Sequence, residues 1–172
     1  MVSINQLQQL MEQYTEGLIR LAFYYVKDSQ TAEDIVQDVF IKLYTTSNER
    51  TEIKDIKSYL YKMTANKCKD YLKSWSYRKI QFQQKFVNEP KTNQNNNLLK
   101  KDEQTLIGDA ILQLPLKQRE VLIYYYFKEM SVLEIAQFLG ISENTVKSRL
   151  RLGRKQLKEQ LNHIEWEVLL NG

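Results

Sequence analysis

The stretch Ser131–Leu157, SVLEIAQFLGISENTVKSRLRLGRKQL, predicts two helices separated by a tight turn. Ser131 and Glu134 have the spacing of a capping box, in which hydroxyl and carboxylate each satisfy a backbone N–H group at a helix start. Gly140 is expected to end the first helix because glycine readily adopts positive φ, and Ser142 is a favoured N-cap for the second. This pattern is typical of a helix-turn-helix, which places its second helix in the major groove of DNA.

The second of these predicted helices has a buried face and a basic face. Val146, Leu150, Gly153 and Leu157 recur every three or four residues, so they predict the inner face. On the outer face, polar side chains can contact base edges and basic ones can contact phosphates. A solvated basic helix in an ordinary bundle is the alternative, which the combined pattern disfavours. The candidate DNA-binding residues are Asn144, Thr145, Lys147, Ser148, Arg149, Arg151, Arg154 and Lys155.

The composition of the 172-residue chain indicates globular helical domains. Hydrophobic residues make up 42%, and only five Gly and two Pro occur, which disfavours a turn-rich β fold. The single cysteine cannot form an internal disulfide, and one histidine cannot build an ordinary zinc site, so we expect no metal and no cofactor. There is no leader pattern and no apolar run of the ~18 to 20 residues that span a membrane. We therefore expect a cytoplasmic protein without membrane insertion of its own.

A polar stretch divides the chain. Residues 81–101, QFQQKFVNEPKTNQNNNLLKK, are rich in Gln and Asn and have no helical or strand period before Leu98. We therefore predict an all-α fold of two small helical domains, residues 1–80 and 105–172, joined by a flexible linker over residues 81–104.

Two amphipathic helices are predicted in the first domain. Between Asp28 and Tyr44, apolar residues at four-residue spacing form a buried face. A second helix, from about Ile56 to Lys79, has apolar residues on one side and basic residues on another. The exposed stripe of the first helix consists of Asp34, Gln37, Asp38 and Ile41, and the basic stripe of the second consists of Lys62, Asn66, Lys69 and Lys73, with Arg78 near its end. On the residues alone, an ordinary solvated face is the simpler interpretation of the acidic stripe.

The formal net charge of +4 is unevenly distributed along the chain. Residues 1–50 hold four basic and seven acidic side chains, whereas residues 51–80 hold eight basic and three acidic ones. Residues 102–141 are again acidic, with three basic against six acidic side chains, and residues 142–160 are basic, with six against two. Two separate basic segments suggest two contacts with a polyanion and leave the acidic surfaces for a basic partner.

Several motifs resemble the sigma-70 family of RNA polymerase sigma factors, in particular its small extracytoplasmic-function group. The C-terminal half is similar to the family's fourth conserved region at Leu114-Pro115, at Arg119-Glu120-Val121 and over the run from Glu134 to Leu150. The segment Ala32–Phe40, AEDIVQDVF, resembles the second conserved region, and the helix that contains Tyr59-Leu60 continues this similarity.

The resemblance implies a role in transcription initiation without catalytic residues. In the family, the second region docks on the clamp helices of the polymerase's largest subunit and melts the minus-10 element, and the fourth region reads the minus-35 element. The resemblance thereby implies that the acidic stripe binds polymerase (Asp34, Gln37, Asp38, Ile41). It implies that the basic stripe binds minus-10 DNA (Lys62, Asn66, Lys69, Lys73, Arg78). It also implies that the helix from Asn144 to Lys155 binds the minus-35 element. The implied partners are core RNA polymerase, promoter DNA and a cognate anti-sigma factor.

Some positions depart from the family pattern. Tyr59 stands where the family usually has Trp, Met63-Thr64 replaces Ile-Ala, and Lys73 replaces an Arg, which keeps the charge but loses bidentate phosphate geometry. Leu152-Gly153 stands where a basic residue and Ala are common. Because Gly inside a helix costs roughly 0.8 to 1 kcal/mol relative to Ala, we expect local stability or helix approach to differ there.

Three alternative interpretations fit the sequence less well. A stand-alone regulator of the response-regulator output type would bind duplex DNA as a dimer, but it leaves the motifs of residues 32–73 unexplained. A metal-dependent nuclease using Asp34 and Asp38 needs further carboxylates or His nearby, which the sequence does not offer on that face. Cys68 between two lysines is a candidate redox thiol, but an inert, partly buried thiol is the favoured interpretation.

Overall fold

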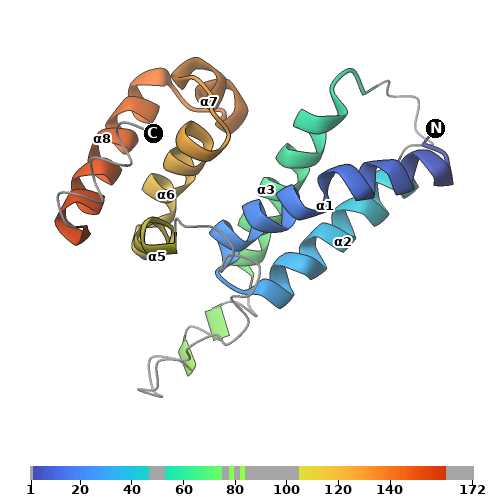
Figure 1. The fold of residues 1–172 in the computed structure, drawn as a ribbon, viewed down its shortest axis with the longest axis horizontal. Coiled ribbons are helices and arrows are strands. Elements are labelled where there is room, and N and C mark those ends of the chain that lie inside the picture. Colours follow the sequence, from blue (N-terminus) through green and yellow to red (C-terminus); the bar gives the residue numbers. More distant parts are fainter. Residues whose placement is uncertain (1, 47–52, 75–77, 80–81, 84–104, 162–172) are drawn as a thin grey trace. The chain divides into compact units, whose positions relative to one another are not determined.

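The computed structural model describes residues 2–46, 53–74, 78–79, 82–83 and 105–161, and every regular element within these ranges is a helix (Figure 1). The chain divides into two compact units, Met1–Leu98 and Leu99–Gly172. The predicted all-α fold class is confirmed. The proposed domain limits at residues 80 and 105 stay predictions, since most of residues 81–104 lie outside the described part of the chain.

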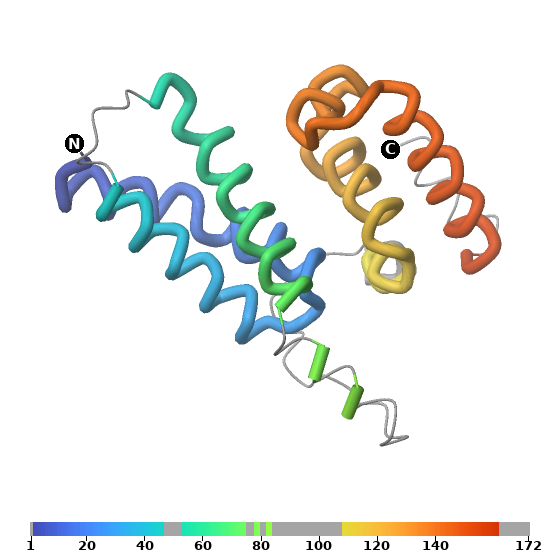
Figure 2. Tube along the Cα trace, turned by 180° about the vertical axis from the view of Figure 1, so that it is seen from behind, coloured from blue at the N-terminus to red at the C-terminus, as the bar shows by residue number. Residues whose placement is uncertain are grey.

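The first unit is a bundle of α1 (Ile4–Val26), α2 (Ser29–Thr46) and α3 (Ile56–Lys73). Each helix packs against the other two, and the three helices lie side by side in both views (Figures 1 and 2). Their facing sides form one apolar core, as the four-residue spacing of α2 predicted. Its fully or nearly fully buried members include Leu18, Leu21 and Tyr25 of α1, Val36, Val39 and Leu43 of α2, and Leu60, Ala65 and Cys68 of α3.

Helix α1 was not predicted as a separate element, although its start carries a readable signal. The Ser3 hydroxyl accepts a hydrogen bond from the Gln6 N–H at 3.2 Å, and the Gln6 side chain accepts one from the Ser3 N–H at 2.9 Å. This is a capping box with Gln in the third helical position. The helix ends at Lys27, which has a φ of 61° and donates its N–H to the Phe23 carbonyl.

Carboxylates stand at the starts of α2 and α3. Asp28 accepts hydrogen bonds from the Thr31 N–H at 2.8 Å and the Thr31 hydroxyl at 2.6 Å. Asp55 accepts one from the Ser58 N–H at 3.1 Å, and its hydrogen bonds with Ser58 hold the pKa of this carboxyl below its usual value. Each carboxylate satisfies backbone donors that have no partner within the helix, so the helices begin where these residues stand.

The predicted end of the second helix was wrong. Helix α3 ends at Lys73, and Ser74 is extended, with a φ of −70° and a ψ of 157°. The Ser-containing segment that follows Lys73 has poor helix propensity, which helix periodicity alone does not weigh. Arg78 therefore lies beyond α3 instead of on its last turn, and Trp75 and Tyr77 lie outside the described residues.

The second unit contains α5 (Thr105–Gln113), α6 (Leu116–Leu122), the π-helical turn η2 (Ile123–Phe127), α7 (Val132–Leu139) and α8 (Glu143–Gln160). The predicted caps of α7 and α8 are confirmed. Glu134 accepts from the Ser131 N–H at 2.7 Å, Gly140 has a φ of 69°, and Ser142 accepts from the Thr145 N–H at 3.1 Å. The predicted inner face of α8 is buried as well.

Gly153 brings α8 close to α6. A Cβ atom added to this residue would lie 2.8 Å from Leu122 Cδ1 and 3.4 Å from Gln118 Cβ. Because Leu122 is fully buried, it has little room to withdraw. Helices α8 and α6 are therefore closely packed at Gly153.

Candidate nucleic-acid and partner-protein interfaces

The acidic stripe of α2 is exposed. Asp34, Gln37 and Asp38 all lie at the surface, and Ile41 is 61% exposed, whereas Val39 between them is fully buried. Tyr44, which is 43% exposed, lies one turn beyond Ile41 on the same side. Tyr44 was not predicted as part of the stripe, although its three-residue spacing from Ile41 was a usable signal. The stripe thus combines carboxylates with two apolar side chains.

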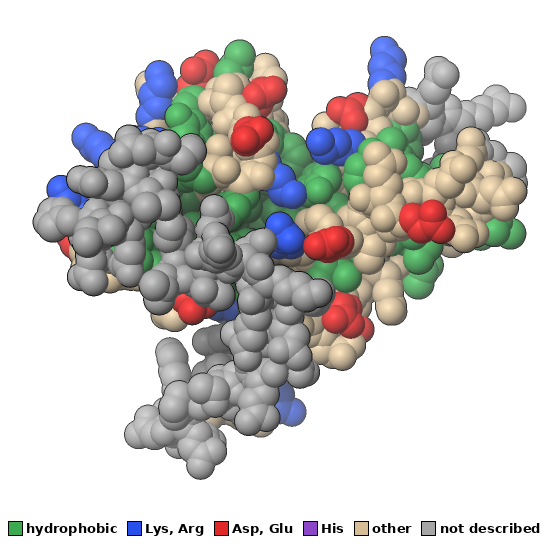
Figure 3. Space-filling view, in the orientation of Figure 1, with side chains coloured by type: hydrophobic (Ala, Val, Ile, Leu, Met, Phe, Trp, Pro, Cys, Tyr) green, Lys and Arg blue, Asp and Glu red, His purple; other side chains and the backbone are tan. Residues whose placement is uncertain are grey.

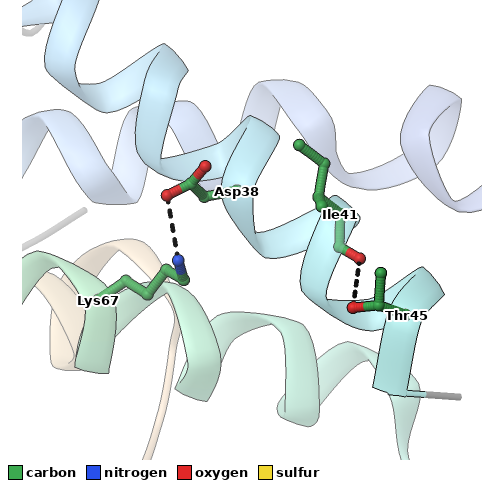
Figure 4. Close-up of polar contacts among 4 residues, drawn as sticks. All are labelled: Asp38, Ile41, Thr45 and Lys67. Atoms are coloured by element: carbon green, nitrogen blue, oxygen red, sulfur yellow. Dashed lines mark hydrogen bonds and ion pairs between the residues drawn. The ribbon is translucent and has the colours of Figure 1, made fainter.

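Asp38 has a partner on α3. Its carboxylate lies 3.1 Å from Lys67 Nζ, and the two side chains are 63% and 30% exposed (Figure 4). Asp34 accepts a hydrogen bond from the Gln30 amide, also at 3.1 Å. Lys67 was not predicted to take part in this surface, since the contact joins residues 29 positions apart. The partly exposed pair is held weakly, because water screens its attraction.

The predicted basic stripe lies along α3. Asn66 and Lys73 are exposed, and Lys62 and Lys69 are partly buried. Lys62, Asn66, Lys69 and Lys73 follow one another at three- or four-residue spacing, which puts them on a common face. Arg78 is exposed but stands outside this helix. The structure therefore brings four of the five predicted residues together.

Several aromatic and thiol side chains of α3 are partly or fully buried. Tyr61 is half-buried, and burial raises the pKa of its hydroxyl. Tyr71 is also partly buried. Cys68 is fully buried, and desolvation raises the pKa of its thiol to about 12. A reactive thiol needs its thiolate at neutral pH, so the inert interpretation of Cys68 is the one that the structure supports.

Helix α8 presents the predicted polar face, and Lys and Arg side chains project along it in Figure 3. The exposed members are Asn144, Lys147, Ser148, Arg151 and Lys155. Arg149 is partly buried, and Thr145 is partly buried with its hydroxyl 2.8 Å from that of Ser142. The exposed side chains stand opposite Val146, Leu150 and Leu157, so the predicted division of the helix into two faces is confirmed.

Arg154 stands apart from the other predicted residues because it is held by two tyrosines. Its Nε donates a hydrogen bond to the Tyr126 hydroxyl at 2.8 Å. Its guanidinium carbon lies 5.2 Å from the ring centroid of Tyr125 and 5.7 Å from that of Tyr126. Tyr124 in the same run is buried, whereas Tyr125 and Tyr126 are partly buried, and their contact with Arg154 was not predicted from the sequence.

Comparison with known proteins identifies the family to which both units belong. The family model described as sigma-70 region 2 matches residues 10–76, and the model described as sigma-70, region 4, matches residues 104–157. The chain is 30% identical over 150 residues to the RNA polymerase sigma factor SigV of Bacillus subtilis, covering 86% of each chain. It is 28% identical over 162 residues to SigZ of the same organism, covering 92% of this chain and 90% of SigZ.

Solved structures show the same fold. The sigma factor RpoE of Bartonella quintana, in complex with the anti-sigma factor NepR, matches with a TM-score of 0.67 at 20% identity, over 91% of this chain and 97% of RpoE. CnrH, in complex with the cytosolic domain of CnrY, matches with a TM-score of 0.61 at 20% identity, over 91% of this chain and 88% of CnrH.

The chain belongs to the sigma-70 family of RNA polymerase sigma factors and to its extracytoplasmic-function group. Its function is non-enzymatic: it binds core RNA polymerase and directs promoter-specific initiation of transcription. Among the described residues, no three His, Cys, Asp or Glu side chains are grouped so that they could hold a metal ion. In the same part of the chain, no helix combines the length and the apolar character needed to cross a bilayer.

Proposed function

We propose that the α2 stripe, the α8 face and the α3 face carry out successive steps of initiation. The α2 stripe, Asp34, Gln37, Asp38 and Ile41 with Tyr44, docks on a basic helical surface of core polymerase. Its carboxylates steer the encounter with that surface, and its exposed apolar side chains add burial once the two surfaces meet. The observation that carries this proposal is the exposure of Ile41 in the middle of an acidic helix face.

The α8 face is proposed to read the minus-35 element. Side chains near the start of the helix, Asn144, Lys147 and Ser148 with Arg151, would meet base edges in the major groove. Thr145, whose N–H donates to the Ser142 cap, lies at the same end. Arg149, Arg154 and Lys155 would contact backbone phosphates, which fix the register of the helix without reading sequence.

The α3 face is proposed to hold the melted minus-10 strand. Lys62, Asn66, Lys69 and Lys73 supply a continuous polar and basic track for a strand backbone, and the exposed Arg78 extends it beyond the helix. Unpairing and unstacking bases costs a few kcal/mol, which the added phosphate contacts and the polymerase contacts would offset. The half-buried Tyr61 lies on the same helix.

We further propose that the protein acts in the cytoplasm and is held inactive by an anti-sigma factor. The anti-sigma factor NepR bound to the sigma factor RpoE is the precedent among proteins of this fold. An anti-sigma factor that covered the α2 stripe would block polymerase docking, and its own contact surface would need basic and apolar side chains. Competition between such a factor and core polymerase for the same stripe tests this regulation.

One experiment separates the three proposed steps. Holoenzyme is reconstituted with variants of each face, and core binding, duplex promoter binding and strand opening are measured separately on the same promoter. Substitution of Asp34 and Asp38 by Lys should strongly weaken the first step. Substitution of Arg151 should weaken the second, and substitution of Lys62 and Lys69 by Ala should leave both intact but reduce permanganate reactivity of minus-10 thymines. Variants that all fail at one common step would contradict the division of labour.

A further inference from the structure

The contact between Arg154 and Tyr126 is the feature that the family motifs leave unexplained. The hydrogen bond of 2.8 Å to the tyrosine hydroxyl uses the Nε donor of Arg154. A guanidinium carries five N–H donors in one plane, so the four donors of its terminal nitrogens remain to bind an anion. The rings of Tyr125 and Tyr126, with centroids 5.2 and 5.7 Å from the guanidinium carbon, restrict the side chain further.

Arg154 stands in a row of cations beside the proposed DNA-reading face. Lys147 and Arg151 lie seven and three residues before Arg154, and Lys158 lies four residues after it. This spacing places all four side chains along one side of α8. These three side chains are exposed, whereas Arg154 is partly buried. The positive potential along this side of α8 attracts the DNA backbone, so Arg154 can pair with a phosphate while Lys147 and Arg151 reach base edges.

Two local features of the chain create the contact. The turn η2 is π-helical, with the Lys128 N–H donating to the Ile123 carbonyl at 3.2 Å, and its adjacent rings Tyr125 and Tyr126 pack edge to face at 5.0 Å. Gly153 lets α8 lie against Leu122, directly before η2. Arg154 follows that glycine, so the close approach brings its guanidinium to the tyrosines. Gly153 is also a position where this sequence departs from the common family pattern.

We propose that Tyr126 is a positioning residue that holds Arg154 ready to bind a backbone phosphate of the minus-35 duplex. This inference rests on the proposed function of α8. A side chain already fixed in its binding geometry loses less freedom when the DNA arrives, so each of its hydrogen bonds contributes more to affinity. Tyr126 thereby tunes promoter affinity without touching a base, and the π-helical turn becomes part of the DNA-binding apparatus.

Salt-dependent promoter binding by reconstituted holoenzyme tests the proposal. Arg154→Ala removes a phosphate contact, so the slope of log affinity against log salt should fall by about one, with an affinity loss of roughly tenfold at low salt. Tyr126→Phe keeps the charge, so it should leave the slope unchanged and lower affinity about threefold. In the Arg154→Ala background, Tyr126→Phe should have no further effect, because it acts through Arg154.

Two further variants serve as matched comparisons. Tyr125→Phe removes the neighbouring hydroxyl and keeps the ring below Arg154, so it should lose less affinity than Tyr126→Phe. Arg154→Lys keeps the charge but loses the Nε bond and the planar stack, so it should behave like Tyr126→Phe, with an unchanged slope. Circular dichroism of each variant establishes that α8 remains folded.

The failure of this inference is distinguishable from failure of the proposed function. An unchanged slope for Arg154→Ala, together with a reduced slope for Lys155→Ala, would make Arg154 a purely structural brace and overturn the inference alone. Full additivity of Tyr126→Phe and Arg154→Ala would equally overturn the positioning role. If Arg151→Ala and Lys155→Ala also left promoter binding unchanged, the proposed minus-35 function of α8 itself would fall.

Discussion

The two units hold their interface charges in different ways. On α2, the carboxylate of Asp38 is more than half exposed and pairs across the surface with Lys67. On α8, the guanidinium of Arg154 is partly buried, hydrogen-bonded to Tyr126 and stacked near two rings. A screened surface ion pair is readily exchanged for another, whereas a hydrogen-bonded and stacked guanidinium keeps its direction.

This difference suits the proposed partners. A protein surface brings its own cations, so a carboxylate whose intramolecular partner is loosely held can change partners when the two proteins meet. DNA brings only anions at a fixed spacing, so a cation that is already oriented matches one phosphate in a defined register. Under the proposed assignments, the N-terminal unit would exchange charge partners on binding, whereas the C-terminal unit would present a preset geometry.

The largest expected effect comes from reversing the α2 stripe. Asp34→Lys together with Asp38→Lys should weaken core polymerase binding by roughly a hundredfold, because like charges placed opposite one another cost several kcal/mol. The measurement is an affinity titration of the labelled sigma factor with core enzyme, with circular dichroism to establish unchanged helicity.

Helix α1 supplies a matched control for this variant. Glu12 and Glu16 are also exposed carboxylates four residues apart on one helix, and Glu12 likewise accepts a hydrogen bond from a glutamine, Gln8. Changing both of them to Lys shifts the net charge by the same amount. If this control lost as much affinity as the α2 variant, the loss would reflect overall charge, and the assignment of the docking surface to α2 would be wrong.

The next effect separates two kinds of contact within α8. Arg151→Ala should cost about 1 to 3 kcal/mol of promoter binding and relax the preference at one minus-35 position, as expected for a bidentate base contact. Lys155→Ala should instead weaken all promoters alike and lower the salt slope by about one phosphate contact. Transcription from promoters with single minus-35 substitutions, at several salt concentrations, measures both.

These two variants also sharpen the comparison between the units. A uniform loss for Arg151→Ala across the promoter panel would make Arg151 a phosphate contact and shift the reading register of α8. The preset geometry of the C-terminal unit would then serve only affinity.

The sequence predicted local features well and tertiary contacts poorly. The limits of α7 and α8 follow from capping residues and a glycine within the same few positions, which local backbone chemistry determines. The division of α8 and α2 into buried and exposed faces follows from helical periodicity. The end of α3 was not predicted because apolar spacing ignores the poor helix propensity of the residues after Lys73. The start of α1 was not predicted because apolar spacing also ignores its capping box.

The contacts that distinguish the two interfaces lie outside the reach of such patterns. Asp38 pairs with a residue 29 positions away, and Arg154 bonds one 28 positions away. Neither pair shares a helix, so each depends on how closely two helices approach. Gly153 was the one signal of close approach, and only the structure shows that Leu122 is its neighbour.

A smaller effect tests that close approach. Gly153→Ala should gain roughly 0.8 to 1 kcal/mol in helix propensity but lose about 1 to 3 kcal/mol through overlap with Leu122, for a net destabilisation of about 1 kcal/mol. Calorimetric unfolding of Gly153→Ala, Leu122→Val and the double variant measures it. The shorter Val should relieve the overlap, so the double variant should lose less stability than the two single variants together. Stabilisation by Gly153→Ala alone would mean that the contact relaxes at little cost.

The smallest effect concerns Lys67. If Asp38 exchanges Lys67 for a cation of the polymerase, the Lys67 ammonium competes with the polymerase for the Asp38 carboxylate. Lys67→Gln should raise core affinity by a factor of two to five, since an exposed ion pair contributes about 0 to 1 kcal/mol. The gain should appear mainly in the association rate and shrink at high salt, because the freed carboxylate steers the encounter.

Lys57→Gln, at the exposed start of the same helix, makes the same change in net charge and should leave affinity within error of the wild type. In the Asp38→Asn background, Lys67→Gln should have no effect on affinity, since no carboxylate remains to be released. A loss of affinity on Lys67→Gln would show instead that Lys67 orients Asp38 or contacts the polymerase itself, and both units would then present preset charges.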